Sequence, residues 1–125
     1  MNLKRFLAIA VLFLMSFQGY ASHLLGGEIV WKCKPNGKYQ FTLVLYRECG
    51  GITLPTSAQS LATNAGVSIS CAFISTTDVV PSCYTGTTTC AGATSGTGKM
   101  QKYVYRSGDI TLTGTPPASG WYFTW

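Results

Sequence analysis

Residues 26–49 read GGEIVWKCKPNGKYQFTLVLYREC, and this stretch carries the strongest structural signal in the 125-residue chain. Two runs in which apolar residues alternate flank residues 34–38, which contain the turn formers Pro, Asn and Gly. Alternation on either side of a short turn is typical of a β-hairpin. Because side chains two residues apart share a face of a strand, one face of this hairpin carries Ile29, Trp31 and Cys33, then Tyr39, Phe41, Leu43 and Leu45.

The length of the turn determines which of these side chains lie opposite one another. A two-residue Asn-Gly loop would place Trp31 opposite Thr42 and would divide the apolar side chains between two faces. A three-residue loop, residues 35–37, keeps them on one face, because Pro35 suits a type I turn and Gly37 supplies the left-handed residue that follows. The sequence therefore predicts the register in which Trp31 faces Phe41 and Ile29 faces Leu43.

A long hairpin with one apolar face needs a second layer to cover that face. Only 10% of the residues are charged, and no long helical periodicity is present, which also favours an all-β domain. We therefore predict an immunoglobulin-like β-sandwich, antiparallel and incomplete at its C-terminal end, preceded by a signal-peptide helix.

The rest of the chain contains three further regions with strand or hairpin patterns. Residues 66–74 alternate as a third strand, and residues 121–125 form an aromatic run that predicts the last one. Residues 100–106 and 109–113 predict a second hairpin around a Ser-Gly pair. The polar segment that ends at Asn64 has too few apolar residues to predict a strand.

The first 21 residues have the three parts of a secretory signal peptide. Lys4 and Arg5 form a basic beginning, residues 6–17 are nearly all apolar, and small residues precede a cleavage point after Ala21. The apolar run is well short of the roughly 20 residues that span a bilayer. We therefore expect a secreted chain, at the cell surface or outside the cell, with a mature β-sandwich domain over residues 22–125.

Five cysteines agree with an oxidising compartment, and an odd number leaves one thiol without a partner inside the chain. Cys83 and Cys90 flank a short loop and are the easiest pair to close. Cys33 lies beside the hairpin turn and Cys49 at the far end of the second strand, roughly 30 Å away if that strand is straight. The candidates for disulfides are Cys33, Cys49, Cys71, Cys83 and Cys90, and their connectivity stays open.

The sequence stops inside the aromatic run 121–125, without a closing turn. Domain ends rarely fall there, because an exposed apolar strand edge invites pairing with other chains. Together with the odd cysteine, this predicts that the chain is the N-terminal part of a longer protein.

Several ordered segments resemble the N-terminal domain of large secreted gliding motility-associated proteins of gliding bacteria. They are HLLGGEIVWKC at residues 23–33, YQFTLVLYRECGG at residues 39–51, and a later series of Tyr-x-Tyr, Thr-x-Thr, Pro-Pro, Gly-Trp and aromatic residues. The likeness covers most of residues 22–125. It implies adhesion and surface display, and for a parent protein it implies further immunoglobulin-like or PKD-like modules and export by the type IX secretion system.

Catalysis has little support in the sequence. A glycosidase needs two carboxylates about 5 to 9.5 Å apart, and a nucleophilic triad needs a base beside its nucleophile. The single histidine, His23, lies at the amino end, and the four carboxylates are Glu28, Glu48, Asp78 and Asp109. Pairing of the first two strands along their length would bring Glu28 toward Glu48, but solvated carboxylates are the simpler interpretation. We predict no enzyme, no metal site and no cofactor.

Nucleic acid is not an expected partner, because the Lys and Arg residues are scattered singly rather than gathered in a stripe. Exposed aromatic residues often mark recognition surfaces, so four tyrosines are candidates for a flat ligand platform. These are Tyr46, Tyr103, Tyr105 and Tyr122. The tryptophans Trp31, Trp121 and Trp125 lie instead at strand positions expected to face the core.

Two classes of function remain. The first is a structural or adhesion module of a secreted cell-surface protein, linked to gliding motility or surface attachment, with surface glycans or other cell-surface proteins as partners. The second is a carbohydrate-binding module of a secreted multidomain enzyme.

Overall fold

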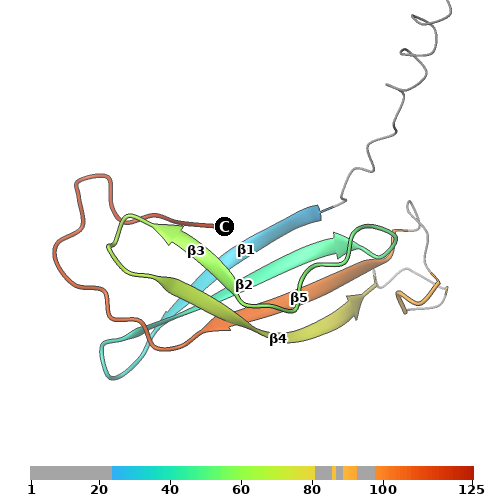
Figure 1. Cartoon of the computed structure of the whole chain (residues 1–125), viewed down its shortest axis with the longest axis horizontal. Coiled ribbons are helices and arrows are strands. Elements are labelled where there is room, and N and C mark those ends of the chain that lie inside the picture. The colour runs from blue at the N-terminus through green and yellow to red at the C-terminus, as the bar shows by residue number, and fades with distance from the viewer. Residues whose placement is uncertain (1–23, 81–85, 87–88, 93–97) are drawn as a thin grey trace, which may run out of the picture.

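Six antiparallel strands form one curled sheet in the computed structural model, which describes residues 24–80, 86, 89–92 and 98–125 (Figure 1). The order of the strands across the sheet is β1-β2-β5-β4-β3-β6. The predicted all-β antiparallel fold is confirmed. The strands are β1 (Leu24–Cys33), β2 (Tyr39–Glu48), β3 (Gln59–Thr63), β4 (Ile69–Val79), β5 (Met100–Ser107) and β6 (Phe123–Thr124).

The predicted register of the first hairpin is also confirmed. Trp31 pairs with Phe41 and Ile29 with Leu43, so the alternating residues Phe41, Leu43 and Leu45 of β2 stay on one face, while Val44 lies on the other. Phe41, Leu43 and Leu45 are almost completely buried on that face. A slip of one residue would move all three to the other side of the sheet, which is why burial selects this register.

The turn between β1 and β2 has the three-residue form that the sequence predicts. The backbone N–H of Gly37 donates to the Lys34 carbonyl at 2.9 Å, and the N–H of Lys34 donates to the Lys38 carbonyl at 2.8 Å. Gly37 has a φ of 74°, a left-handed conformation in which a Cβ atom is strained. The Asn36 side-chain oxygen accepts a bond from the Lys38 N–H at 3.1 Å.

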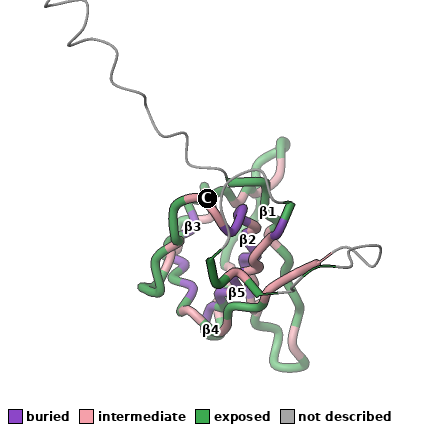
Figure 2. The backbone as a smooth tube through the Cα atoms, turned by 90° about the vertical axis from the view of Figure 1, so that its right-hand side faces the viewer, coloured by how far each residue is buried: buried purple, intermediate pink, exposed green. Residues whose placement is uncertain are grey.

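The sheet curls until its last strand covers the inner face of β2. The rings of Phe41 in β2 and Phe123 in β6 lie 4.6 Å apart between centroids, although the two strands are at distant places in the sheet order. The view along the long axis shows buried residues gathered inside this curl (Figure 2). The sheet is nearly closed and sandwich-like, with a core of Phe41, Leu43, Leu45, Leu61, Ile69, Cys71, Tyr103 and Tyr105.

The predicted strand at residues 66–74 is correct in kind, but β4 begins at Ile69 and continues to Val79. A bulge between Phe73 and Ser75 interrupts its pairing with β5. Strand β3 was not predicted, because the alternation of its sequence QSLAT is too weak to be recognised. Its one core residue, Leu61, is buried only because the curl places it over the inner face.

The prediction that residues 100–106 and 109–113 form a second hairpin is wrong. Strand β5 pairs with β2 on one side and β4 on the other, so no edge is left for residues 109–113 to pair with. These residues cross to the end of β2 instead, where Ile110 and Tyr39 exchange two backbone hydrogen bonds of 2.8 Å. Alternation indicates that a segment can form a strand, but it does not show whether the preceding strand has a free edge for that segment to pair with.

The hairpin turn is held to the segment after β5 by a charged contact. The Lys34 Nζ donates to Asp109 Oδ1, and the Asn36 Nδ2 donates to Asp109 Oδ2 at 3.3 Å. These hydrogen bonds hold the pKa of the Asp109 carboxyl below its ordinary value, and the bond from Lys34 has the larger effect. The turn is therefore fastened at a point 75 residues away in the sequence.

A pH titration should detect this contact. The lowered pKa means that the contact stabilises the fold above the unfolded value near about pH 4, and that this contribution is lost as the pH falls through the folded value. NMR titration of the Asp109 carboxyl should give a pKa below the ordinary value, and Lys34→Met should raise it. Lys102→Met, on β5, should leave it unchanged; an equal response in both variants would contradict the contact.

A pair of aromatic substitutions tests how far the opposite layer covers the inner face of the hairpin. Phe41 is 1% exposed and Trp31, directly opposite, is 59% exposed. Phe41→Ala should lower the free energy of unfolding by about 3–5 kcal/mol, through lost burial and the cavity left behind. Trp31→Ala should cost about 1 kcal/mol or less, because the lost contact is mainly its edge-on packing against Tyr39. Urea unfolding measures both, and equal losses would contradict this difference in burial.

Candidate functional site

An open groove lies between β1 and β6, on the side where the curl does not close. Its volume is about 420 Å³. Gly27 is required in its wall, since a Cβ there would lie 2.8 Å from the Val44 carbonyl oxygen and 2.7 Å from a Leu45 methyl. We call this the β1–β6 groove, and its lining residues are Leu24, Gly26, Gly27, Glu28, Ile29, Leu43, Leu45, Phe123, Thr124 and Trp125.

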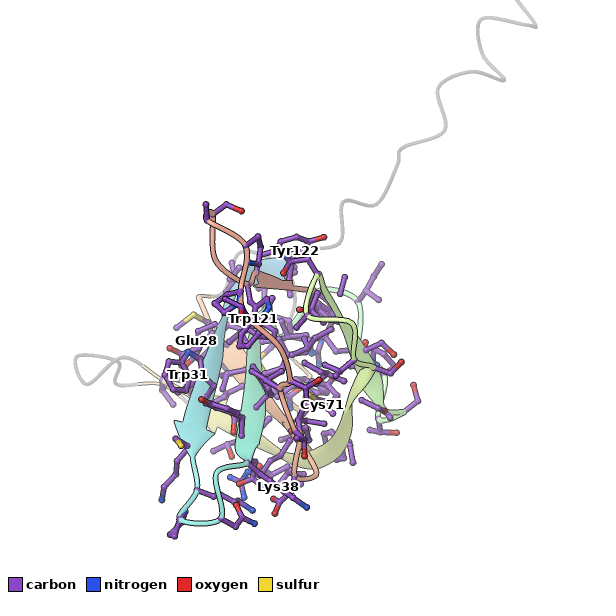
Figure 3. The ribbon with its side chains drawn as sticks, turned by 90° about the vertical axis from the view of Figure 1, so that its left-hand side faces the viewer. Glu28, Trp31, Lys38, Cys71, Trp121 and Tyr122 are labelled. Atoms are coloured by element: carbon purple, nitrogen blue, oxygen red, sulfur yellow. A yellow bond between two sulfur atoms is a disulfide. The ribbon has the colours of Figure 1, made fainter. Side chains whose placement is uncertain are left out.

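A second hollow of about 330 Å³ adjoins the groove, because Phe123 lines both. We call it the aromatic hollow. Trp31 packs edge-on against Tyr39 at its rim, with ring centroids 5.8 Å apart. Trp121 lies on the C-terminal segment that passes over the hairpin (Figure 3). The hollow is lined by Trp31, Tyr39, Phe41, Leu112, Pro116, Gly120, Trp121 and Phe123.

The four candidate tyrosines do not share one surface. Tyr103 and Tyr105 are 3% and 0% exposed and belong to the core, and the Tyr105 hydroxyl donates to the Pro55 carbonyl at 2.8 Å. Burial, followed by the neighbouring Tyr103, raises the pKa of Tyr105. Tyr46 is half-buried, and Tyr122 is 57% exposed.

The expectation that the tryptophans face the core is wrong for two of them. Trp31 and Trp125 are 59% and 48% exposed, while Trp121 is half-buried. Trp31 shares a face with the core residue Phe41, but it lies on the edge strand β1, where β6 covers the sheet only in part. Sequence alternation identifies the face of a strand and not how far the opposite layer extends over it.

The carboxylates that could have formed an acid–base pair lie apart and are used differently. Glu28 is opposite Val44, four positions from Glu48 along β2. Asp78 accepts a bond from the Cys90 N–H at 2.9 Å and another from the Gln101 amide at 2.9 Å. Asp109 holds the hairpin turn, as described above.

A buried polar network at the far end of β2 was not predicted. Arg47 is only 7% exposed, and its guanidinium donates to Gln101 Oε1 at 2.8 and 3.0 Å and to the Gly51 carbonyl at 2.9 Å. Gln101 also accepts a bond from the Tyr103 hydroxyl and, as noted, donates to Asp78. Arg47 is thus no surface residue; it joins β2, β5 and β4 to the loop that follows β2.

A disulfide joins Cys49 to Cys90, across 41 residues of sequence. Cys90 therefore does not pair with Cys83, the partner that a short loop would make easiest to close, and Cys83 lies outside the described residues. Short separation favoured that pair, but the network around Asp78 holds the Cys90 backbone beside the end of β2. Cys33 and Cys71 are free thiols, the first exposed and the second buried, and burial raises the pKa of Cys71.

The signal peptide at residues 1–21 and His23 also lie outside the described residues. Within the described ranges, no three His, Cys, Asp or Glu residues gather as metal ligands, and no helix qualifies as a membrane span. Comparison of the chain with protein families, with curated proteins and with solved structures found no match.

The disulfide should make a measurable contribution to stability. Replacing Cys49 and Cys90 together with Ala should lower the free energy of unfolding by about 2–4 kcal/mol, because the cross-link restricts the unfolded chain. Cys33→Ser, at an exposed free thiol, should have almost no effect. Peptide mapping without reduction should recover one fragment that links Cys49 to Cys90; a fragment that links Cys83 to Cys90 would contradict this pairing.

Proposed function

We propose that this chain is a non-enzymatic structural or adhesion module of a secreted cell-surface protein, with a role in surface attachment or gliding motility. The disulfide supports the first part of the proposal, because such bonds persist in oxidising compartments outside the cytosol. The resemblance of residues 23–33 and 39–51 to gliding motility-associated proteins supports the second.

The observation that carries the proposal is the exposure of large apolar side chains around the β1–β6 groove and the aromatic hollow. Leu24, Trp31 and Trp125 all line one of these two depressions and are exposed. Contiguous exposed apolar surface of this kind marks an interaction site on a folded domain. A module that holds another molecule by contact needs such a surface and no reacting groups.

The chemistry of the groove indicates the kind of partner. Aromatic rings offer flat apolar faces, which suit the faces of sugar rings and the apolar side chains of proteins. Polar atoms at the rim, from Glu28 and Thr124, can exchange hydrogen bonds with hydroxyl or amide groups. Surface glycans and other cell-surface proteins both meet these requirements.

A second candidate is a carbohydrate-binding module of a secreted multidomain enzyme. It is favoured by the aromatic hollow, in which Trp31 and Trp121 border one depression. This candidate differs from the first in its ligand, a soluble or insoluble polysaccharide that the parent enzyme would cleave.

Binding assays with three matched variants test the proposal. Full-length protein, exported into an oxidising compartment, is coupled to beads and tested for attachment to intact bacterial cells and to purified polysaccharides. Trp121→Ala and Trp125→Ala, which each alter one depression, should reduce attachment by about tenfold, as expected for loss of an aromatic contact of roughly 1–1.5 kcal/mol. Tyr122→Ala, at an exposed aromatic residue between them but outside both linings, should retain attachment.

The probes separate the two candidates. Attachment to cells without binding to polysaccharides supports an adhesion module, whereas saturable binding to one polysaccharide supports the carbohydrate-binding module. Equal attachment by all three variants and the unmodified protein would contradict a role for the groove and the hollow.

A further inference from the structure

The free edge of β1 borders the β1–β6 groove and offers backbone groups that the function proposed above does not use. Strand β1 is 10 residues long and pairs with β2 on one side; it is the terminal strand of the sheet order. It is exposed along nearly its whole length. In Figure 3 the labelled Glu28 and Trp31 lie along this outer strand.

The turn determines which residues of β1 form backbone hydrogen bonds to β2 and which direct their backbone groups to the free edge. Lys34 donates to Lys38, so these two form a hydrogen-bonded pair, and such pairs recur at every second position of an antiparallel ladder. Lys32, Val30 and Glu28 therefore direct their backbone groups toward β2. The neighbouring strand agrees, since the N–H groups of Tyr39 and Phe41 point away from β1, to Ile110 and to Ser107.

The alternate residues, Gly27, Ile29, Trp31 and Cys33, consequently direct their N–H and C=O groups to the free edge. Proteins usually protect such an edge with Pro, with bulges or with a like charge that repels another copy. From Gly27 to Cys33, β1 has no Pro and its pairing with β2 shows no bulge. Its two charges, Glu28 and Lys32, have opposite signs and lie symmetrically on either side of Val30.

We propose that this edge binds β1 of a second copy of the chain in antiparallel pairing, with Val30 on the two-fold axis. In this arrangement Ile29 and Trp31 of one copy exchange hydrogen bonds with Trp31 and Ile29 of the other. Gly27 pairs with Cys33 in the same way. The free backbone groups of the strand are then satisfied over seven residues, from position 27 to position 33, without any change in the pairing of β1 with β2.

Charge selects this register. With Val30 on the axis, Glu28 of each copy lies opposite Lys32 of the other, at a non-hydrogen-bonded position where side chains approach most closely. An axis at Glu28 or at Lys32 would place like charges opposite each other. An axis at Trp31 would leave Lys32 opposite Val30 and would bring Glu28 to Lys34, which already binds Asp109.

Apolar contacts agree with the same register. The exposed ring of Trp31 would lie beside Ile29 of the second copy, on the face that borders the β1–β6 groove. On the opposite face, Val30, which is also exposed, would contact Val30 of the second copy. Each copy thus covers the apolar side chains that β1 leaves open to solvent in the other.

A charge exchange tests the pairing, with the dimer constant of the full exported protein measured by sedimentation equilibrium. All proteins carry Cys33→Ser, so that no adventitious disulfide contributes. Glu28→Lys and Lys32→Glu should each weaken dimerisation on the order of tenfold, because two attractive pairs become repulsive. The double variant should recover the unmodified constant, and a mixture of the two single variants should form heterodimers in preference to either homodimer.

A cross-link gives a second readout of the register. In the same Cys33→Ser background, Val30→Cys should form a covalent dimer on mild oxidation, because the two thiols meet on the axis. Lys32→Cys is the matched control and should not form a covalent dimer, since the two cysteines would lie four residues apart along the strands. A monomer at all concentrations, a double variant that stays weak, or equal cross-linking at both positions would overturn the proposal.

Discussion

Strand β2 is hydrogen-bonded to β1 on one side and to β5 on the other, and its inner face carries Phe41, Leu43 and Leu45. A strand held on both edges cannot rotate its apolar face toward solvent or slip by one residue without exposing that whole face. The curl of β4, β3 and β6 over this face follows from the need to cover it. Positions as distant in the sheet as Phe41 and Phe123 therefore meet in one core.

The two ends of β2 are secured by different means. At the turn, Lys34 and Asn36 hold Asp109 near the surface, where charged contacts are weak individually. At the other end, the buried guanidinium of Arg47 is surrounded by acceptors, and the Cys49–Cys90 disulfide lies close by. A buried charge requires such partners, because leaving it unpaired away from water is costly. Covalent and polar contacts thus secure this end of β2, where the Arg47 guanidinium lies over the ring of the core residue Tyr103.

The side of the domain between β1 and β6 has a different character. Here a strand edge and a strip of apolar side chains are both left exposed, including Trp31 and Trp125. Exposed apolar side chains also occur elsewhere, as at Ile74 on β4, but on this side they lie next to two surface depressions and the free edge of β1. The groove and the edge share residues, since Gly27, Glu28 and Ile29 line the groove, Trp31 lines the aromatic hollow, and all four lie on β1. Pairing of copies through β1 would therefore cover part of the surface offered to a ligand.

The local pattern of residues 26–49 determined the three-residue turn and the register of the first hairpin, because alternation and Gly37 act over short distances; the bulge between Leu24 and Gly26 was not predicted. The all-β class and the alternation of β4 and β5 followed from the same kind of signal. The choice of pairing partners, both between strands and between cysteines, did not follow from the local sequence. Alternation in residues 109–113 could not reveal that both edges of β5 are occupied, and spacing could not reveal that Cys90 is bonded to Cys49. The exposure of Trp31, the burial of Arg47 and the open groove depend on how far the curled layer extends. That extent is a property of the packed sheet as a whole, so only the tertiary structure decided them.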